Sequence, residues 1–283
     1  MVTAAAVDPT PADGDARRLP RLNTLWVEGR LTYVEQACLC SAVRAGHPVT
    51  LYSYFDVSGV PAEVEHRDGR EVMPERALVK HRQKDSWALA ADLFRYELLR
   101  QGRGVWIDAD LVLLRPIEIA GRAVLFGWQK PGLINNAVLY AEPDSALLSA
   151  LESHLAQPHL IPWWLPWRKR WPYELRAALG LRPLTLAENR WGITGPRALT
   201  YVARELDLTG SAEPPEVFYP YGPKRARDAF DPTVDVRSRF GARTRAVHLW
   251  NEIIKGLKLR PPPAGSFMAE ICAELGVSTA GTA

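Results

Sequence analysis

The chain has 283 residues, of which 47% are hydrophobic and 24% are charged, and its formal net charge is +3. These values are those of an ordinary soluble globular protein, long enough for one large or two small domains with a sizeable core. The charge is too small to indicate nucleic acid, and the sequence carries no P-loop, zinc-finger or RNA-binding motif, so we expect no nucleic-acid partner.

Both ends of the chain are predicted to be disordered tails. Residues 1–21 are rich in Ala, Pro and Asp, and they lack the basic start and apolar run of a signal peptide. The last residues, 277–283, are expected to form a second tail. No apolar run approaches the ~18 residues that a membrane span requires, so a cytoplasmic location is the default expectation. The remaining residues, 22–276, are predicted to form one domain.

The first elements form a β-α-β unit. Residues 22–27 are predicted to be a strand, and Thr32 with Glu35 is a capping-box pattern that begins a helix to about residue 45. Gly46 ends this helix, and an alternating strand follows over residues 49–54. Such an opening is expected of a nucleotide-binding α/β sheet.

A helix, a turn and a buried strand follow between residues 86 and 116. Apolar residues recur there at helical spacing, namely Trp87, Ala91, Phe94 and Leu98. Gly102 supplies a left-handed stop, and the apolar residues 105–107 read as a buried strand.

Two carboxylates, Asp108 and Asp110, follow this strand. They would be costly to bury unless they were paired or bound to a cation. At positions i and i+2 of an extended chain, their side chains lean to the same side and converge. Such a pair suits Mn²⁺ or Mg²⁺, with water and phosphate oxygens in the remaining coordination positions.

This segment resembles the DXD-motif glycosyltransferases, in which S-D-x-x-R-Y-x-x-L…G-G-x-Y-x-D-x-D precedes a proline. The matching positions are held by Asp92, Arg95, Tyr96, Leu99, Gly104, Trp106, Asp108, Asp110 and Pro116. Ala91 and Arg103 depart from the pattern, and neither removes a ligand. The resemblance is to the retaining group that includes α-1,4-glycosyltransferases, initiating mannosyltransferases and clostridial glucosylating toxins. It implies an α/β fold of the GT-A type, a Rossmann-like single domain with a mixed central sheet flanked by helices.

The same resemblance implies roles for residues that bind the donor. Asp92 and Arg95, with Tyr96 beside them, would contact the donor sugar, whereas spacing alone also allows a surface ion pair. Trp26, at the end of the first strand, would stack on the nucleotide base, and packing in the core is the alternative that the pattern leaves open.

Two strand-like runs, residues 123–127 and 137–141, come next, and Asn135 and Asn136 stand before the second. The resemblance implies that this pair lies over the transferred sugar. Asn is also common in turns because it tolerates positive φ, so a plain turn remains open. A helix is predicted over residues 145–157.

Residues 161–173 have the most unusual local composition, with four tryptophans beside Arg168, Lys169 and Arg170. Amphipathic rings next to cations suit a membrane interface or an anionic lipid carrier, which would make the protein peripheral to the inner face of the membrane. The alternative is an irregular insert whose rings pack on the domain. The prolines argue against one regular helix across the whole stretch.

The last elements complete the predicted site. Thr194 is predicted to cap a helix that starts with Gly195 and Pro196, and in the family this helix start lies beside the active-site cleft. The strand 246–250 carries His248, which the resemblance makes a third metal ligand, although a single His on an apolar strand is often a core residue.

Further implications of the resemblance concern the donor diphosphate. Lys255 would bind it, with Trp250 in the same pocket. A closing helix is predicted over residues 266–275, ended by Gly276.

These residues predict a metal-dependent retaining glycosyltransferase. A sugar would pass from a nucleotide diphosphate sugar, expected to be UDP-linked, to a hydroxyl of a glycan, a lipid-linked saccharide or another small acceptor, as in bacterial polysaccharide biosynthesis. Asp108, Asp110, Asp92 and Arg95 would be the catalytic residues. Two alternatives remain: a non-catalytic sugar-nucleotide-binding or partner-binding module, and a phosphatase of the haloacid dehalogenase type, whose first motif Asp108 and Asp110 also satisfy.

Overall fold

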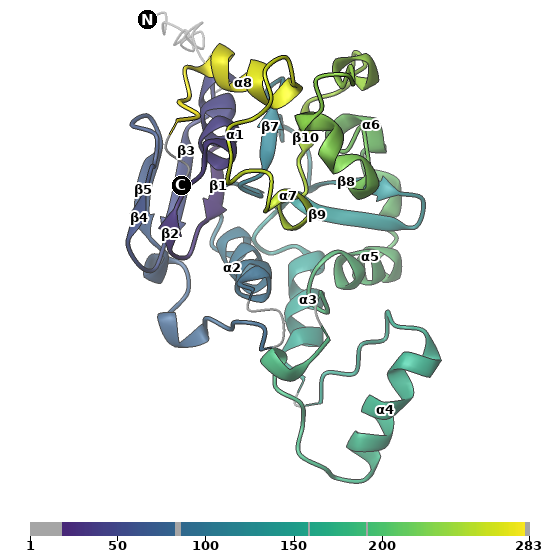
Figure 1. The fold of residues 1–283 in the computed structure, drawn as a ribbon. Coiled ribbons are helices and arrows are strands. Elements are labelled where there is room, and N and C mark those ends of the chain that lie inside the picture. The colour runs from purple at the N-terminus through teal and green to yellow at the C-terminus, as the bar shows by residue number, and fades with distance from the viewer. Residues whose placement is uncertain (1–18, 83–85, 158, 191, 281–283) are drawn as a thin grey trace, which may run out of the picture.

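The computed structural model describes residues 19–82, 86–157, 159–190 and 192–280 (Figure 1). Residues 1–18 and 281–283 of the two predicted tails therefore lie outside the described residues, and the tails stay a prediction. Of the residues that are described in them, Arg21 donates to Thr50 Oγ1 over 2.7 Å.

Runs of two to four strands are separated by single α-helices up to residue 141, and the rest of the chain is mainly helical. The strands are β1 (Leu22–Leu25), β2 (Gly29–Arg30), β3 (Val49–Ser53), β4 (Val57–Ser58), β5 (Glu65–Asp68), β6 (Val105–Ile107), β7 (Leu111–Leu113), β8 (Val124–Lys130), β9 (Leu133–Ala141) and β10 (Ala246–His248). The α-helices are α1 (Tyr33–Arg44), α2 (Ala88–Arg100), α3 (Ala146–Leu155), α4 (Trp167–Ala178), α5 (Pro196–Glu205), α6 (Pro215–Phe218), α7 (Asn251–Ile254) and α8 (Phe267–Leu275).

The centre of the fold is a six-stranded mixed sheet in the order β5-β3-β1-β6-β9-β8. The strands β5, β3, β1 and β6 run parallel to one another. Strand β9 is antiparallel to β6 and to β8. Outside this sheet, β10 pairs antiparallel with β7, and β2 pairs parallel with β4. The α/β class with a mixed central sheet flanked by helices is confirmed.

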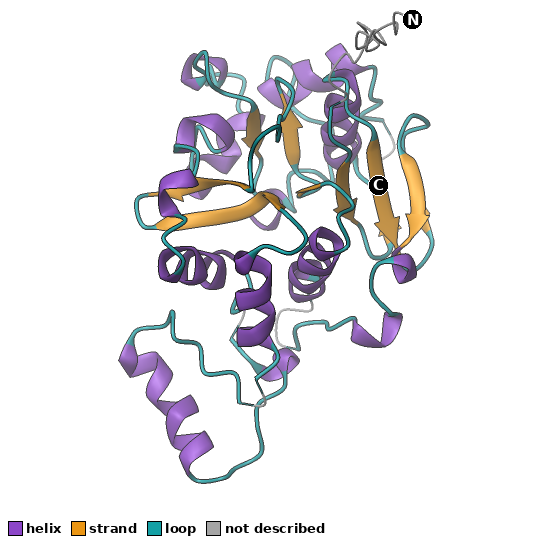
Figure 2. Ribbon diagram, turned by 180° about the vertical axis from the view of Figure 1, so that it is seen from behind, coloured by secondary structure: helices purple, strands orange, loops and turns teal. Residues whose placement is uncertain are grey.

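Helices cover both faces of the sheet, as the views from front and back show (Figures 1 and 2). One apolar cluster joins α2, α3 and α5 to one face, and the others join α1 and α8 to the opposite side. Strand β6 serves both: Trp106 belongs to the first cluster, and its neighbours Val105 and Ile107 belong to the second. An apolar run without alternation is therefore what this central strand requires.

Helix α1 begins as its sequence predicts. The Thr32 hydroxyl accepts from the backbone N–H of Val34, and the Glu35 carboxylate accepts from the backbone N–H of Thr32 over 2.8 Å. Gly46 follows the helix with a φ of +93°, which favours glycine.

The predicted hairpin after Pro116 is longer than its sequence suggested. Strand β8 reaches Lys130 and β9 begins at Leu133, so Asn135 and Asn136 lie within β9 instead of in a turn before it. The turn residue is Gly132, with a φ of +80°. Both asparagines are buried, and burial with satisfied polar groups is what keeps them in a strand against their usual preference.

Helix α5 begins at Pro196, as predicted, but its N-cap differs from the predicted one. Gly195, not Thr194, is the N-cap, and Pro196 is the first helical residue. The Thr194 hydroxyl instead donates to Asp92 Oδ2 over 2.7 Å. A tertiary partner has replaced the local cap.

Candidate active site

The first two site carboxylates lie where β6 leaves the central sheet. The Asp108 N–H donates to Ala137 O on β9 over 2.8 Å, which is the last contact of β6 with the sheet. Ala109 and Asp110 then form a turn, and β7 departs to pair with β10. The expectation that an extended chain makes the two carboxylates converge was therefore wrong, because the turn between β6 and β7 brings them together.

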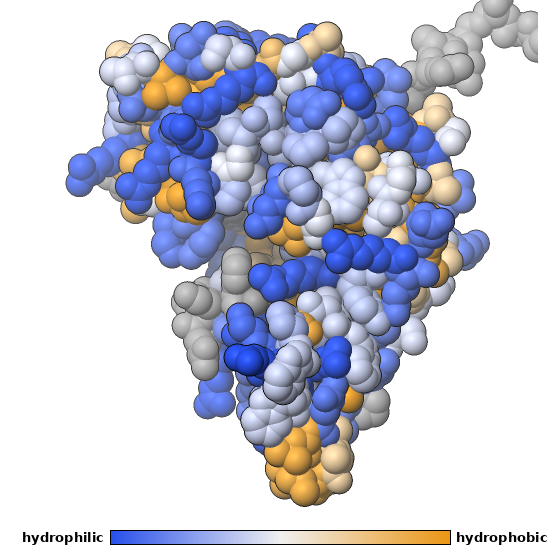
Figure 3. Space-filling view, turned by 90° about the vertical axis from the view of Figure 1, so that its right-hand side faces the viewer, coloured by the Kyte–Doolittle hydropathy of each residue, from blue (hydrophilic) through white to orange (hydrophobic). Residues whose placement is uncertain are grey.

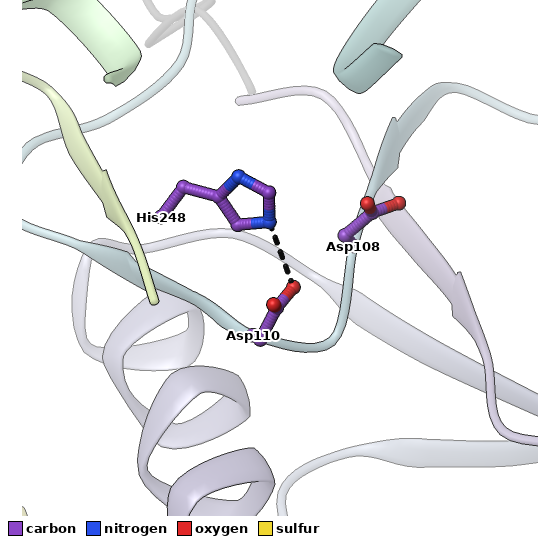
Figure 4. A group of neighbouring side chains, drawn as sticks. All are labelled: Asp108, Asp110 and His248. Carbon is purple, nitrogen blue, oxygen red and sulfur yellow. Dashed lines mark hydrogen bonds and ion pairs between the residues drawn. The ribbon is translucent and has the colours of Figure 1, made fainter. Parts of the chain in front are cut away.

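Strand β10 adds a histidine to the pair. The antiparallel pairing with β7 sets His248 opposite Leu111, next to Asp110. His248 Nε2 lies 3.2 Å from Asp110 Oδ1, and Asp108, Asp110 and His248 each offer one ligand atom within 4.8 Å of the others (Figure 4). Within the described residues this is the one group of three or more such side chains that converges. We name it the triad.

The residues after β10 hold Asp110 in place. Trp250 has a φ of +61°, a left-handed conformation that is rare for a bulky residue. The next residue, Asn251, thereby donates its backbone N–H to Asp110 Oδ2 over 2.6 Å. The Trp250 ring lies 4.1 Å, centroid to centroid, from the imidazole of His248. Strain at Trp250 therefore accompanies the positioning of two triad residues.

Helix α2 contributes a second charged pair beside the triad. Arg95 Nη2 lies 3.2 Å from Asp108 Oδ1 and 3.4 Å from Asp92 Oδ1. The guanidinium also stacks on Trp106, whose indole N–H donates to Asp108 Oδ1 over 2.7 Å. Asp92 and Arg95 are 7% and 4% exposed, so they do not form the surface ion pair that spacing alone allowed.

Polar groups of other elements donate hydrogen bonds to both oxygens of the buried Asp92 carboxylate. Asn136 Nδ2 donates to its Oδ1 over 2.9 Å, and Thr194 donates to its Oδ2. Tyr96, one turn further along α2, donates its hydroxyl to Thr194 O over 2.7 Å. A Cβ on Gly195 would stand 3.0 Å from Asp92 Oδ2, so the backbone of the α5 start approaches as closely as glycine permits.

The pKa values in this region follow burial and charge. Desolvation raises the pKa of Asp92, although Arg95 and the hydrogen bonds from Thr194 and Asn136 oppose that rise. Burial alone would lower the pKa of Arg95, but the charges of Asp108 and Asp92 outweigh the effect of burial, so the pKa is raised. Burial opposes charge on Asp110 as well, yet the adjacent His248 and the Asn251 N–H hold its pKa below the ordinary range.

Other predicted donor-binding residues have mixed surroundings. The Trp26 ring is half-buried directly after β1, and the ammonium of Lys258 lies 5.2 Å from its centroid. Lys258 in turn pairs with Glu35, which is fully buried. Lys255, the predicted diphosphate ligand, is exposed and pairs with Glu252 over 2.9 Å. The first asparagine of the predicted pair, Asn135, donates to Gln129 Oε1 over 3.0 Å.

The sequence did not predict several contacts between residues of the candidate site. Trp106 and Thr194 bind the two carboxylates Asp108 and Asp92, and Lys258 lies over Trp26. The contacts of Thr194 with Asp92 and of Lys258 with Trp26 join distant parts of the chain, so local spacing carried no signal for them, whereas Trp106 stands only two positions before Asp108.

A cavity of ≈ 460 Å³ lies between α2, α3 and the segment 72–74. Leu93, Tyr96 and Leu148 are among the side chains that line it, and no member of the triad does. Tyr96 is the residue that this cavity shares with the predicted site.

Comparisons with known proteins gave one kind of match. No protein-family model matches the sequence, and no curated protein matches it. A solved structure described as "PaToxG Glycosyltransferase" is similar in fold, with a TM-score of 0.42 and 10% sequence identity, over 66% of this chain and 70% of that one.

Proposed function

We propose that the protein is a metal-dependent retaining glycosyltransferase, which moves a sugar from a nucleotide diphosphate sugar, UDP-linked, to an acceptor hydroxyl. The observation that carries the proposal is the convergence of Asp108, Asp110 and His248 on one point, with the buried Asp92–Arg95 pair joined to it through Asp108. Sequence elements far apart meet there as the DXD resemblance requires.

The chemistry of the triad fits a divalent cation. Two carboxylates and an imidazole are ligands that Mn²⁺ accepts, whereas Mg²⁺ binds almost entirely through oxygen. His248 turns its Nε2 toward Asp110, 3.2 Å from Asp110 Oδ1, so the ring nitrogen on the carboxylate side is the one available to a cation. We therefore favour Mn²⁺ over Mg²⁺. When bound, the cation would offset the negative charge that develops on the departing diphosphate.

The protein's own side chains have separate tasks in this proposal. Arg95 holds Asp108 in position, because its guanidinium is occupied by Asp108, Asp92 and the Asn136 carbonyl. Asp92 lies beside the site, and its Oδ2, which accepts from the Thr194 hydroxyl, has a lone pair left that can accept from a sugar hydroxyl.

The nucleotide end of the donor is proposed to lie toward β1. The indole N–H groups of Trp26 and Trp250 and the Asn251 Oδ1 atom are buried and unpartnered among the residues described. A nucleotide or its diphosphate would supply the missing partners, with Lys258 a better placed cation than Lys255 because it lies on Trp26.

The two alternatives predict different assays. A binding module would take up UDP-sugar with Mn²⁺ and release nothing. A phosphatase would release phosphate from simple phosphomonoesters, and a buried arginine that pairs with its nucleophile Asp108 would then have to be displaced.

The proposal is tested by the release of UDP from a panel of UDP-sugars, with Mn²⁺ and with chelator. We expect hydrolysis that requires the metal, and a loss of at least ~100-fold for Asp110→Asn, which is the scale of removing one electrostatic group from an active site. Asp144→Asn, at an exposed carboxylate before α3, is the matched control and should retain the wild-type rate. Metal-independent hydrolysis, or equal rates for both variants, would refute the metal role.

A further inference from the structure

The segment 159–190 stands away from the sheet and its covering helices, with α4 at its outer side (Figures 1 and 2). We name residues 161–190 the finger. None of the α4 residues is buried. The finger is rooted through Trp164, which packs between His154 and Tyr201 on the body. Residues such as Tyr173 and Arg176 are only half-buried, so α4 gains little from packing, and stability of the domain does not explain its exposed apolar side chains.

Large apolar side chains of α4 form one continuous exposed ridge. The ridge consists of Trp167, Trp171, Leu175 and Leu179, which are between 45% and 65% exposed. Residues four apart lie above one another on a helix, so these four side chains share one face. Trp163 before the helix and Leu181 after it are also exposed. In the space-filling view the far end of the finger carries an apolar tip (Figure 3).

Positive charge accompanies the ridge. Residues 161–190 contain six Lys and Arg residues and two Glu residues, a net charge of +4, whereas the entire chain has +3. The two carboxylates are already neutralised inside the finger, since Glu174 pairs with Arg170 and Glu188 pairs with Arg182. Arg168 and Lys169 have no acidic partner in the described part of the chain. The excess charge is therefore free to meet an anionic surface.

No single helix spans residues 161–173, as the prolines indicated. Residues 161–166 are not helical, but α4 begins directly after Pro166 and continues through Pro172. The alternative was that the four tryptophans of residues 161–173 pack on the domain. Only Trp164 does so, because Trp163, Trp167 and Trp171 are exposed.

We propose that the finger docks the protein on an anionic lipid bilayer, with the α4 ridge inserted at the headgroup level and the basic residues on the lipid phosphates. Indole rings prefer this interfacial depth, and cations beside them are attracted by anionic lipids. No helix among the described residues is long and apolar enough to cross a membrane, which is consistent with attachment at the surface. The proposal does not depend on the chemistry of the triad.

The test is co-sedimentation of the full chain with vesicles of phosphatidylcholine alone or mixed with phosphatidylglycerol. We expect wild-type protein to bind the mixed vesicles and to be released by high salt. Replacing the ridge, Trp167→Ser with Trp171→Ser, should lower the partition coefficient at least about tenfold. Reversing charge, Arg168→Glu with Lys169→Glu, should lower it by at least about tenfold on mixed vesicles only.

Matched controls remove the same chemistry from other faces. Phe55→Ser deletes an aromatic ring that is 42% exposed, and Arg225→Glu reverses a charge on a side chain that is 67% exposed. Both should bind as the wild type does. Absence of wild-type binding to mixed vesicles, or binding unaffected by the ridge and charge variants, would overturn the proposal. So would self-association in sedimentation velocity that the ridge variant abolishes while vesicles remain unbound, because the ridge would then be a contact between copies.

Discussion

The candidate active site and the finger distribute polarity in opposite ways. At the site, charged side chains are inside: Asp92, Arg95 and Asp110 are nearly inaccessible and are held by one another and by neighbouring polar groups. On the finger, large apolar side chains such as Trp167 and Leu179 are outside, and the basic residues Arg168 and Lys169 have no acidic partner among the described residues. Each arrangement is unfavourable by itself in an isolated domain, since buried ion pairs seldom add net stability and exposed apolar ridges add none.

Under the two proposals, the regions serve ligands of different kinds. A buried and pre-arranged charge network suits a small charged ligand whose position must be exact to within a fraction of an ångström. An open ridge with diffuse charge suits a soft, extended surface. Mutations should therefore act on stability at the site and on association at the finger.

The largest expected effect on stability is at Arg95. Arg95→Met leaves Asp92 without its opposite charge in a buried position and should lower the free energy of unfolding by about 3–5 kcal/mol. Arg100→Met, on the same helix, removes an exposed pair with Glu97 and should cost at most ~0.5 kcal/mol. Urea unfolding of both variants measures the difference, and similar losses would break the distinction between buried and exposed charge.

A smaller loss is expected where α5 meets Asp92. In Gly195→Ala the new methyl would stand 3.0 Å from Asp92 Oδ2, so the network must shift, at a cost of about 1–3 kcal/mol. Gly210→Ala is the control, because a Cβ there meets nothing within 4 Å. Thermal unfolding at one pH compares the stability of the two variants. An unchanged stability of Gly195→Ala would show that the added methyl group is accommodated beside Asp92 without cost.

A pH dependence of stability is expected from His47, a buried histidine outside the candidate site. Burial lowers the pKa of His47 below its usual 6.5, and the ring is used neutral, accepting from the Ile117 N–H and donating to Pro20 O. Below about pH 6.5 the unfolded chain therefore takes up a proton that the folded protein resists. The free energy of unfolding decreases as the pH is lowered, until the pH reaches the pKa of His47 in the folded protein. His47→Gln should weaken this slope in pH-dependent urea titrations; an unchanged slope would assign it to other groups.

The smallest effect on stability is expected in the finger. Trp167→Ser with Trp171→Ser should change the free energy of unfolding by no more than ~0.5 kcal/mol, because neither ring is buried in the folded protein. Urea unfolding without lipid is the measurement. A loss as large as that of Arg95→Met would mean that the ridge packs on the body in solution.

The sequence predicted elements whose signals are local. The Thr32–Glu35 capping box, the Gly102 stop and the apolar strand before Asp108 were confirmed because neighbouring residues decide them. The place of Asn135 in β9 and the loss of the Thr194 cap were mispredicted. Both follow from contacts with distant elements that override local preference.

The candidate site was predicted in its members more than in its geometry. Asp108, Asp110 and His248 were selected from motif resemblance, and the structure brings them together. The cause of their convergence, a turn between β6 and β7 with β10 alongside, depends on strand pairing that spacing does not encode. For the same reason Asn251 and Lys258 were not recognised as supports of the site, and the short-range contact of Trp106 with Asp108 was missed as well.

The central claim is that the triad holds one divalent cation. The most direct measurement is electron paramagnetic resonance of Mn²⁺ titrated into the wild-type protein, with Asp110→Asn and the control Asp144→Asn beside it. We expect one Mn²⁺ bound per chain by the wild type and the control, and an affinity lower by at least about tenfold in Asp110→Asn. Equal Mn²⁺ binding by all three proteins, or none by the wild type, would contradict the account.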